Sequence, residues 1–459
     1  MAAIDVVIMA AGKGTRMKSS MPKVLHRLGG RALVQHVIDS AHQLKARHII
    51  AITGHGAELV EAALAGQAGL RFARQMPQLG TGHAVQQALP LLEDDGVTLV
   101  LSGDVPLTQV ATLQALLQAS QGTQLALLTL QTAQPTGYGR IVRNAHGEVQ
   151  AIVEEKDATD EQRAISEIYS GIMAVPTRWL RAWLARLDNH NAQQEYYLTD
   201  VVKFARADGQ PVAAHLISDA AEVAGVNNPV QLAELERAHQ ARQAHALMLS
   251  GVRLADPARL DVRGTLTCCP DVEIDVNCVF DGVVSLGEGV RIGANCVIAN
   301  AHIAAGAVIH PFTHIDGEKA GVTIGRHARV GPFARLRPGA VLGEDVHIGN
   351  FVEVKNTTMA QGSKANHLAY LGDASVGERV NYGAGSITAN YDGVNKHRTV
   401  IEADVHVGSN SVLVAPVTIG AGGTIGGGST ITKDTPPGAL TVARGKQTSI
   451  ANWQRPQKK

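Results

Sequence analysis

The sequence predicts two folds in one chain, an α/β domain with a mostly parallel sheet followed by a parallel β-helix. In the first half, hydrophobic runs typical of strands alternate with helical patterns, which favours parallel strands joined by crossover helices. From Val252 to Asp434, aliphatic residues recur every six positions. A period of six fits neither a helix nor one long alternating strand, but it fits short strands joined by tight turns around a shared core.

The six-residue repeat occurs in three runs. Small residues, mostly glycine, proline or alanine, lie near most of the aliphatic positions, as tight corners require. Three strands form a coil of about 18 residues, and coils stack about 4.8 Å apart, so about ten coils would form a prism about 50 Å long. The aliphatic positions are Ile274, Phe280, Leu286, Ile292, Ile298, Ile324, Val330, Leu336, Leu342, Ile348, Val354, Val407, Leu413, Ile419, Ile425 and Ile431.

Composition argues against several classes of partner. The 459 residues carry 41 basic and 41 acidic side chains, so net charge gives no reason to expect nucleic acid or an anionic membrane. No apolar run is long enough to insert into a membrane. The four cysteines lack a CxxC spacing and a matching histidine set, which argues against zinc. Cys278 and Cys296 lie one predicted coil apart, so we expect stacked, buried thiols and a reducing, cytoplasmic setting.

The first predicted strand runs into a glycine-rich turn, Ala11–Met17, and a helical pattern begins after Pro22. Strand, glycine-rich turn and helix form a phosphate cradle, because glycine lets backbone N–H groups approach phosphate oxygens. The turn is neither a Walker loop nor a full GxGxxG, and by itself it is also compatible with an ordinary tight turn. Lys13, Arg16 and Lys23 surround it, and this set of cations suits a triphosphate.

Further strands are expected at His48–Thr53, Val97–Asp104 and Gln124–Leu130, as central parallel strands of the sheet. Ligands of such sheets gather at the carboxyl ends of the strands. Gln78–Gly82 and Asp104 fall at such ends. A carboxylate there can hold Mg²⁺ between phosphates, although a lone aspartate before a proline also fits a turn or cap role.

The order of the motifs carries more information than any one of them. They are AAGKGTRM, Pro22-Lys23, LGTGHA, SGDVPL, TGYGRI, VEEKDAT, EYYLTD and GVNNP. In this order they resemble the sugar-1-phosphate nucleotidylyltransferases, which have a Rossmann-like domain. With the hexapeptide repeats attached, the chain resembles bacterial enzymes that join N-acetylglucosamine-1-phosphate uridylyl transfer to glucosamine-1-phosphate N-acetylation. The resemblance covers essentially the whole chain, and it implies a left-handed β-helix and homotrimers with active sites between neighbouring prisms.

The predicted domains are a uridylyltransferase domain at 1–228, a linker helix at 229–250, and a β-helix acetyltransferase domain with a C-terminal tail at 251–459. Asn228-Pro229 fits a helix N-cap followed by proline at the first helical position. The residues from Val230 to Leu249 are rich in helix formers and predict a helix about 30 Å long.

For the first domain, the resemblance implies that UTP and N-acetylglucosamine 1-phosphate give UDP-N-acetylglucosamine and pyrophosphate. Arg16 and Lys23 would be catalytic by steadying the phosphates, and Asp104 and Asn227 would hold Mg²⁺. Tyr169 stands where the family commonly has asparagine, so a hydroxyl or backbone contact would replace an amide contact there. The implied substrate-binding set is Met9, Ala10, Ala11, Gly12, Lys23, Gln75, Gly80, Thr81, Ser102, Gly103, Asp104, Gly139, Glu154, Tyr169 and Asn227.

In the second half the repeat slips after Val354 and again after Tyr382, where insertions on one face are expected. N-acetylation needs a base with a pKa near neutral to deprotonate the amine, and imidazole suits this role. The resemblance singles out His367 as that base. It implies that Arg337, Lys355, Tyr370 and Asn381 hold the sugar phosphate, and that Ala384, Asn390, Tyr391, Ser409, Gly427 and Arg444 meet the co-substrate acetyl-CoA. Gly427 stands where alanine is frequent.

Two other interpretations compete with a two-activity enzyme. In one, the protein is a nucleotidylyltransferase whose β-helix serves only oligomerisation. In the other, the β-helix is a repetitive binding or structural module, which would need uninterrupted polar rows on one face. The polar residues concentrate instead at the slips of the repeat, and this favours catalysis there.

Overall fold

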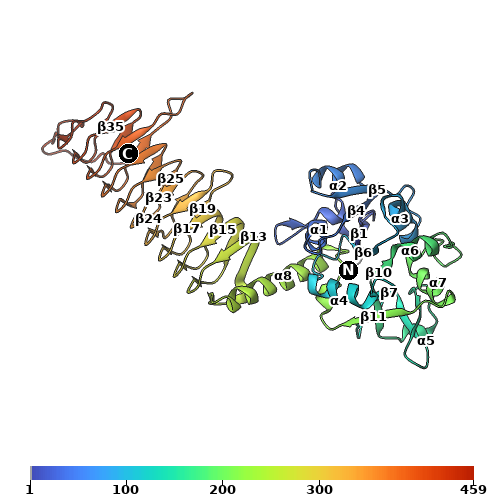
Figure 1. The fold of residues 1–459 in the computed structure, drawn as a ribbon. Coiled ribbons are helices and arrows are strands. Elements are labelled where there is room, and N and C mark those ends of the chain that lie inside the picture. Colours follow the sequence, from blue (N-terminus) through green and yellow to red (C-terminus); the bar gives the residue numbers. More distant parts are fainter. Residues whose placement is uncertain (1–2, 459) are drawn as a thin grey trace. The chain divides into compact units, whose positions relative to one another are not determined.

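The computed structural model describes residues 3–458, which form two compact units that divide between His239 and Gln240. Each unit is described by itself (Figure 1). Within the described residues, no helix combines the length and the apolar character that crossing a membrane requires.

The first unit is built on a nine-stranded mixed sheet. Its strands are β1 (Ile4–Met9), β4 (His48–Thr53), β5 (Leu70–Arg74), β6 (Val97–Ser102), β7 (Leu125–Gln131), β8 (Arg140–Arg143), β9 (Val149–Val153), β10 (Glu167–Pro176) and β11 (Val212–Ile217). The main order is β11-β7-β10-β6-β1-β4-β5, with the β8–β9 hairpin attached to β10. The neighbours of β1 are parallel, as predicted, but β10 runs antiparallel between β6 and β7. The predicted strand at β7 is therefore separated from β6 by β10, and its parallel neighbour is β11.

Helices cover both faces of this sheet. The longer helices are α1 (Leu33–Gln43), α2 (Ala57–Ala63), α3 (Thr81–Ala88), α4 (Val110–Ser120), α6 (Thr177–Leu184) and α7 (Val201–Ala207), and the short elements include α5 (Asp160–Arg163), η1 (Thr15–Met17), η2 (Lys23–Leu25), β2 (Arg27–Leu28) and β3 (Arg31–Ala32). α3, α6 and α7 share one apolar core with the sheet, and α1, α2 and α4 share the other. This alternation confirms the predicted α/β class.

The prediction of a helix directly after Pro22 is wrong. The chain forms the short 3-10 turn η2 and the β2–β3 hairpin, and α1 begins only at Leu33. Gly29 and Gly30 have φ angles of 55° and 81°, left-handed values that reverse the chain between the two short strands. The glycine-rich turn therefore does not lead into a helix N-terminus, and any phosphate contact there comes from the loop itself.

The helix α8 (Pro229–Leu249) begins where the sequence predicts. The N–H of Gln231 donates to the Asn228 side chain at 2.9 Å, which is the predicted N-cap. Leu235, in the first half of the helix, is buried in an apolar cluster of the first unit, and Ala244, in the second half, is buried in the core of the second unit. The two halves of one helix thus contribute to two separate cores.

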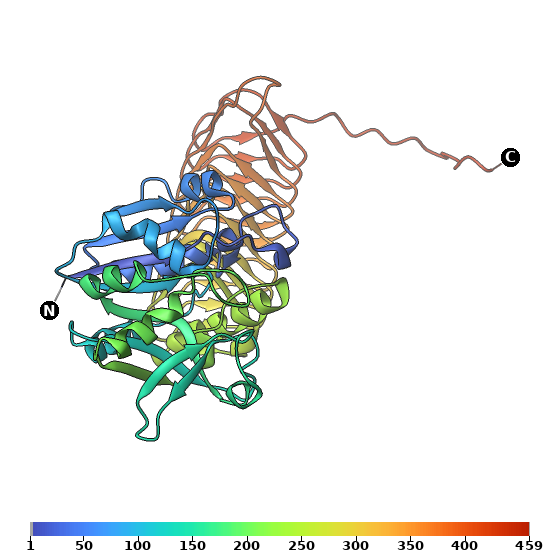
Figure 2. The same ribbon diagram turned by 90° about the vertical axis from the view of Figure 1, so that its right-hand side faces the viewer.

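The second unit is a parallel β-helix with three faces, visible as stacked strands in Figure 2. The first face has β12 (Arg253–Leu254), β14 (Glu273–Ile274), β16 (Arg291–Ile292), β18 (Val308–Ile309), β21 (Arg329–Val330), β24 (His347–Asn350), β27 (Lys364–His367), β30 (Asn381–Tyr382), β33 (His406–Val407), β36 (Thr424–Ile425) and β38 (Leu440–Thr441). The second has β19 (His314–Asp316), β22 (Arg335–Leu336), β25 (Glu353–Lys355), β28 (Tyr370–Gly372), β31 (Ile387–Ala389), β34 (Val412–Val414) and β37 (Thr430–Ile431). The third has β20 (Val322–Ile324), β23 (Val341–Leu342), β26 (Thr358–Met359), β29 (Ala374–Val376), β32 (Thr399–Ile401) and β35 (Val417–Ile419). In the early coils, β13 (Leu260–Cys268), β15 (Cys278–Leu286) and β17 (Val297–Ile303) run across the last two faces.

The core of the β-helix follows the six-residue repeat. Every aliphatic position predicted from the repeat is at most 3% exposed and belongs to one continuous core. Burial of each such side chain stabilises the fold by about 1.5–3 kcal/mol. Cys278 and Cys296 are buried in neighbouring coils, as predicted, and burial raises the pKa of these thiols to about 11 and about 12. Such thiols are inert at neutral pH.

The two slips of the repeat have different structures. After Val354 the next core residue is Met359, so the coil is one residue short and no insertion leaves the stack, which corrects the expected loop. After Tyr382 the expected insertion is present, because residues 390–398 leave the coil and return through a bridge between Tyr391 and Lys396. We call residues 390–398 the insertion loop.

Candidate active sites

The first unit has a pocket of about 450 Å³ at the carboxyl ends of β1, β5 and β6. Ten of its lining residues belong to the predicted substrate-binding set: Met9, Ala10, Ala11, Gly12, Lys23, Gln75, Gly80, Thr81, Ser102 and Asp104. Gly80 has a φ of 108°, and a Cβ there would lie 2.7 Å from the backbone of Tyr196, so only glycine fits. The predicted gathering of motifs at the strand ends is confirmed for these residues.

A smaller pocket of about 220 Å³ adjoins the first and shares Met9, Thr81 and Ser102 with it. Gly139, Glu154 and Tyr169 line it. The Glu154 carboxylate accepts a hydrogen bond from the Thr199 hydroxyl at 3.0 Å, and burial raises the pKa of Glu154. Tyr169 is buried, its hydroxyl has no partner within residues 3–458, and burial raises its pKa.

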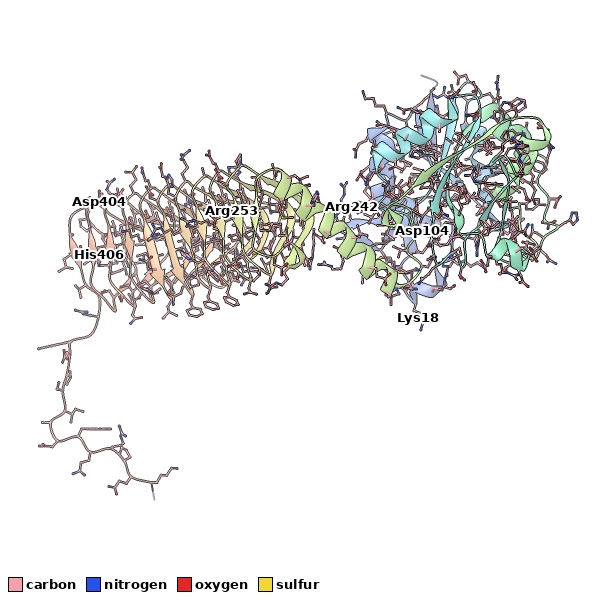
Figure 3. The ribbon with its side chains drawn as sticks, turned by 90° about the horizontal axis from the view of Figure 1, so that it is seen from below. Lys18, Asp104, Arg242, Arg253, Asp404 and His406 are labelled. Atoms are coloured by element: carbon pink, nitrogen blue, oxygen red, sulfur yellow. The ribbon has the colours of Figure 1, made fainter. Side chains whose placement is uncertain are left out.

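A cluster of cations and oxygens lies at one side of the larger pocket; Figure 3 labels Asp104. The Lys23 ammonium forms an ion pair with Asp104 and lies 3.3 Å from the amide oxygen of Asn227. Arg16 donates to the same Asn227 oxygen at 2.8 Å. The N–H of Val226 donates to the backbone oxygen of Asp104 at 3.0 Å, which fixes the two segments side by side. The predicted catalytic cations and metal ligands therefore form one cluster.

Not every predicted residue lines a pocket. Gly103 lies behind the larger pocket, where its N–H donates to the Met9 oxygen at 2.9 Å. Several lining residues lie outside the predicted binding set. They include Gln78, which donates to the Ala11 oxygen at 3.0 Å, and Thr199. Gln78 lies in the segment Gln78–Gly82 and Thr199 in the motif EYYLTD. Membership in these segments was the sequence signal that could have identified both as lining residues.

In the second unit, His367 lies at the end of β27, on an outer corner between the first and second faces. It is exposed, and its Nδ1 atom lies 3.0 Å from the side-chain oxygen of Asn350 in the preceding coil. The strand registers place Ala384, Ser409 and Gly427 at the same position of the three following coils. These small residues form a column about 14 Å long above His367, at the usual strand spacing.

The far end of this column carries a cation. Arg444 donates to the backbone oxygen of Gly427 at 2.6 Å and is exposed. A Cβ on Gly427 would lie 3.3 Å from the oxygen of Ser409, so an alanine would fit only tightly. Asn381 is on the first face, where its amide lies 3.2 Å from Nδ1 of His406, which Figure 3 labels. Asn381 therefore lies on a different face from Arg337, Lys355 and Tyr370, with which the sequence interpretation grouped it.

Three cations surround Tyr370 on the second face. Arg337 donates to Glu353 at 2.8 Å, and this carboxylate raises the pKa of Arg337. Lys355 lies beside Lys396 of the insertion loop, whose ammonium lowers the pKa of Lys355. Two neighbouring ammonium groups repel each other, so this arrangement favours an anion between them.

The insertion loop is anchored by a buried carboxylate. Asp373 accepts hydrogen bonds from the amides of Asn356, at 2.6 Å, and Asn390, at 2.5 Å. Asp373 and Asn390 are each at most 9% exposed. Tyr391, the next residue, is exposed, and its hydroxyl donates to the Gly393 oxygen. The predicted acetyl-CoA residues Asn390 and Tyr391 thus lie at the base of the loop, one fixed and one open to solvent.

An apolar stack runs along the corner beside His367. At this position of successive coils the backbone has a positive φ, and the residues are Asn277, Asn295, Phe312, Phe333, Phe351, Leu368, Gly385, Asn410 and Gly428. Asparagine and glycine tolerate this conformation, whereas bulky apolar residues rarely adopt it. The three phenylalanine rings stack with centroids 5.0 and 5.3 Å apart, and they and Leu368 are about half exposed. We call Phe312, Phe333, Phe351 and Leu368 the corner ladder.

Protein-family models match segments in both halves of the chain. A family model for the MobA-like NTP transferase domain matches residues 6–195. A model for the GMPPB C-terminal domain matches residues 262–365, and one for six repeats of the bacterial transferase hexapeptide matches residues 398–433. With the stacked parallel faces, the hexapeptide match confirms the predicted left-handed β-helix class.

Similarity to curated relatives extends over the whole chain. The chain is 76% identical to "Bifunctional protein GlmU" of a Polaromonas species, covering 99% of this chain and 98% of the relative. It is 72% identical to the protein of the same name from Albidiferax ferrireducens, covering 99% of this chain and 100% of the relative. The protein of the same name from Bordetella parapertussis is 58% identical, and the match covers 99% of this chain and 100% of the relative.

Proposed function

The chain belongs to the family of bifunctional GlmU proteins, which are uridylyltransferases and acetyltransferases of UDP-N-acetylglucosamine biosynthesis, and from this premise we propose how its residues divide the two reactions. Residues 1–228 transfer the uridylyl group, 229–250 link the domains, and 251–459 transfer the acetyl group. Glucosamine 1-phosphate is acetylated first, and its product is the acceptor for the other domain. UTP and acetyl-CoA are substrates found inside cells, so the proposal includes a cytoplasmic location.

In the uridylyl site, the larger pocket holds UTP and the smaller pocket holds N-acetylglucosamine 1-phosphate. Their shared wall brings the sugar phosphate and the α-phosphorus together. The sugar phosphate is already ionised, so the protein has to position anions and balance charge rather than supply a base. Arg16 and Lys23 meet the phosphates and the leaving pyrophosphate, and Glu154 and Gly139 hold the sugar.

The oxygens of Asp104 and Asn227 suit Mg²⁺. Both already converge on one cationic group, the Lys23 ammonium, and carboxylate and amide oxygens are the ligands of a hard cation. Within residues 3–458 there is no group of three or more His, Cys, Asp or Glu side chains that could hold a metal. Two protein oxygens, with phosphates and water completing the shell, are typical of Mg²⁺ sites. When bound, the ion screens phosphate charge.

In the acetyl site, His367 takes a proton from the amine of glucosamine 1-phosphate. Asn350, on its Nδ1 side, orients the ring so that Nε2 faces the substrate. Arg337, Lys355 and Tyr370 hold the phosphate from the second face, and Asn381 contributes from the first face. Acetyl-CoA lies along the column of small residues above His367, with its thioester next to the imidazole, its phosphates near Arg444, and Asn390 and Tyr391 at its side.

The acetyl site requires a second copy of the chain, and we assign the protein as a homotrimer. The corner ladder supports this assignment, because it combines an unfavourable backbone conformation with exposed apolar surface directly beside His367. Both costs are offset if a neighbouring prism covers the ladder. Light scattering of the purified protein should give three times the mass of the chain.

One observation carries the proposal of two activities: His367 begins a column of small residues that ends at the exposed cation Arg444. The test is a single mixture of acetyl-CoA, glucosamine 1-phosphate, UTP and Mg²⁺, in which free thiol and pyrophosphate are both measured. His367→Ala should lower thiol release by about 10²- to 10⁴-fold, with pyrophosphate release from supplied N-acetylglucosamine 1-phosphate unchanged. If the wild type releases no thiol, the β-helix serves oligomerisation only.

A further inference from the structure

We propose that the Lys23 ammonium occupies the cation position of the uridylyl site while no nucleotide is bound, so that the divalent ion enters with the nucleotide and not before it. This inference rests on the proposed assignment of Asp104 and Asn227 as metal ligands. Lys23 would then have two positions, one on these oxygens and one on the phosphates.

The contacts of Lys23 are those of a bound cation. Its Nζ atom forms an ion pair with Oδ2 of Asp104 and lies 3.3 Å from Oδ1 of Asn227. Arg16 donates to the same Asn227 oxygen at 2.8 Å. Both oxygens proposed for the metal are therefore already engaged by cationic side chains, and the side chains of Lys23 and Asp104 are only 15% and 20% exposed.

The segments that carry the two oxygens are held in place, whereas the ammonium is on a flexible stem. The Val226 N–H to Asp104 oxygen bond ties the two ligand segments together, and the Asn227 N–H donates to Gln231 in α8 at 2.9 Å. The Lys23 backbone is fixed by η2, and its Cβ packs against Gly14, where an added Cβ would lie 2.8 Å away. The lysine side chain beyond Cβ therefore has the freedom to move.

Charge balance determines when Lys23 moves. A divalent ion and an ammonium cannot share the same two oxygens, because like charges at this separation repel strongly. A triphosphate in the larger pocket supplies new oxygens to Lys23, since Gly12, Lys13 and Lys23 all line that pocket. The anion therefore removes the competing cation and adds ligands for the metal in one step.

The test measures binding of Mn²⁺ to the full-length protein without nucleotide, by the loss of the free-ion electron paramagnetic resonance signal. Lys23→Met, which shortens the side chain by one atom and removes the charge, should bind Mn²⁺ at least about tenfold more tightly than the wild type. Lys23→Gln should also gain affinity, and Lys23→Arg should remain as weak as the wild type. Lys18→Met is the matched control, since Lys18 is an exposed lysine of the same segment, labelled in Figure 3. It should leave Mn²⁺ affinity unchanged.

Adding Asp104→Asn to Lys23→Met should abolish the gain. Equal Mn²⁺ affinity of the wild type and both neutral Lys23 variants would overturn the inference, as would a gain that survives Asp104→Asn. The proposed uridylyl chemistry is judged separately, by pyrophosphate release. If Asp104→Asn alone keeps full pyrophosphate release, Asp104 is not a ligand and the proposed function fails at this residue. If that activity is lost while the Mn²⁺ affinities are equal, only the role of Lys23 is wrong.

Discussion

The two candidate sites differ in how much of each is supplied by one chain. In the α/β unit, loops from several strand ends surround two adjoining pockets, where Lys23 is paired with Asp104 and Arg16 with the amide oxygen of Asn227. In the β-helix, His367 and Arg444 lie on an exposed corner, and Lys355 has a second ammonium as its neighbour.

This difference follows from the two architectures. An open parallel sheet brings many loops to one edge, so a single chain can enclose a substrate. A solenoid stacks similar coils and presents flat faces, so enclosure needs a second solenoid. The comparison therefore implies that assembly matters for acetyl transfer and not for uridylyl transfer.

Breaking the corner ladder should separate the two activities most strongly. In Phe333→Asn/Phe351→Asn, the new residues match Asn295 and Asn410, which occupy the same corner with the same positive φ, so the coils should keep their fold. We expect the trimer to dissociate and acetyl transfer to fall by about 100-fold, because a displaced neighbour no longer completes the site. Uridylyl transfer should be unchanged. Light scattering and the two product assays measure these effects.

The control for this variant is Val283→Asn, which replaces an exposed apolar residue on an earlier coil, away from the ladder. It should leave mass and both activities unchanged. A double variant that remains trimeric, or a monomer that still acetylates at the wild-type rate, would contradict the comparison.

A second prediction concerns the insertion loop. Asp373→Asn replaces one acceptor oxygen by a donor, so one of the amides of Asn356 and Asn390 loses its partner. Asn390 is buried whereas Asn356 is exposed, so the cost is about 1–3 kcal/mol when the Asn390 amide loses its partner, and we expect the loop to loosen. The kcat/KM for acetyl-CoA should fall about tenfold, since 1.4 kcal/mol corresponds to a factor of ten. Steady-state kinetics of both reactions measure the change.

Asp404→Asn provides the comparison for that variant, because Asp404 is an exposed carboxylate of the β-helix whose partner is Arg379. It should leave both reactions unaffected. Equal kcat/KM values for Asp373→Asn and Asp404→Asn would show that the carboxylate does not position the loop for acetyl-CoA. A loss of uridylyl transfer in either variant would show that the two sites are not independent.

The sequence predicted most of what depends on local repetition. One inward residue per short strand is a geometric consequence of a six-residue period, so the β-helix core could be derived position by position. The motifs of the first half lie at strand ends, and topology brings strand ends to one edge. Gly80 and Asp104 therefore lie in one pocket although nothing in their local sequence connects them.

What the sequence did not predict depends on contacts between distant segments. The helical pattern after Pro22 was overridden by the β2–β3 hairpin. Leu28 of the hairpin and Leu33, the first residue of α1, are buried against Leu235 of α8, about 200 positions away in the chain. The shortened coil after Val354 was interpreted as an insertion, because a slip in a repeat does not tell a lost residue from an added loop. The pairing of Lys23 with Asp104 needs three-dimensional adjacency of two separate motifs.

The smallest expected effect concerns stability of the α/β unit and has a sign that depends on pH. Burial raises the pKa of Glu154, so the folded state holds its proton to higher pH than the unfolded state does. Stability from this group is therefore lost as pH rises above the unfolded pKa. Glu154→Gln should melt higher than the wild type at pH 7, by an amount on the order of a degree, and the difference should vanish in acid. Calorimetry at several pH values measures it.

The neighbouring Glu155 provides a control of opposite sign. Arg140 holds the pKa of Glu155 below its usual range, so this carboxylate stabilises the fold above its unfolded pKa and loses that effect as pH falls. Glu155→Gln should therefore melt lower than the wild type at pH 7 and approach it in acid. The same shift direction in both variants would contradict the assignment of a buried sugar-binding carboxylate at 154. Opposite shifts would sharpen the comparison, because the cost in the enclosed site would then come from a buried carboxylate, whereas the cost in the open site comes from exposed apolar rings and neighbouring ammonium groups.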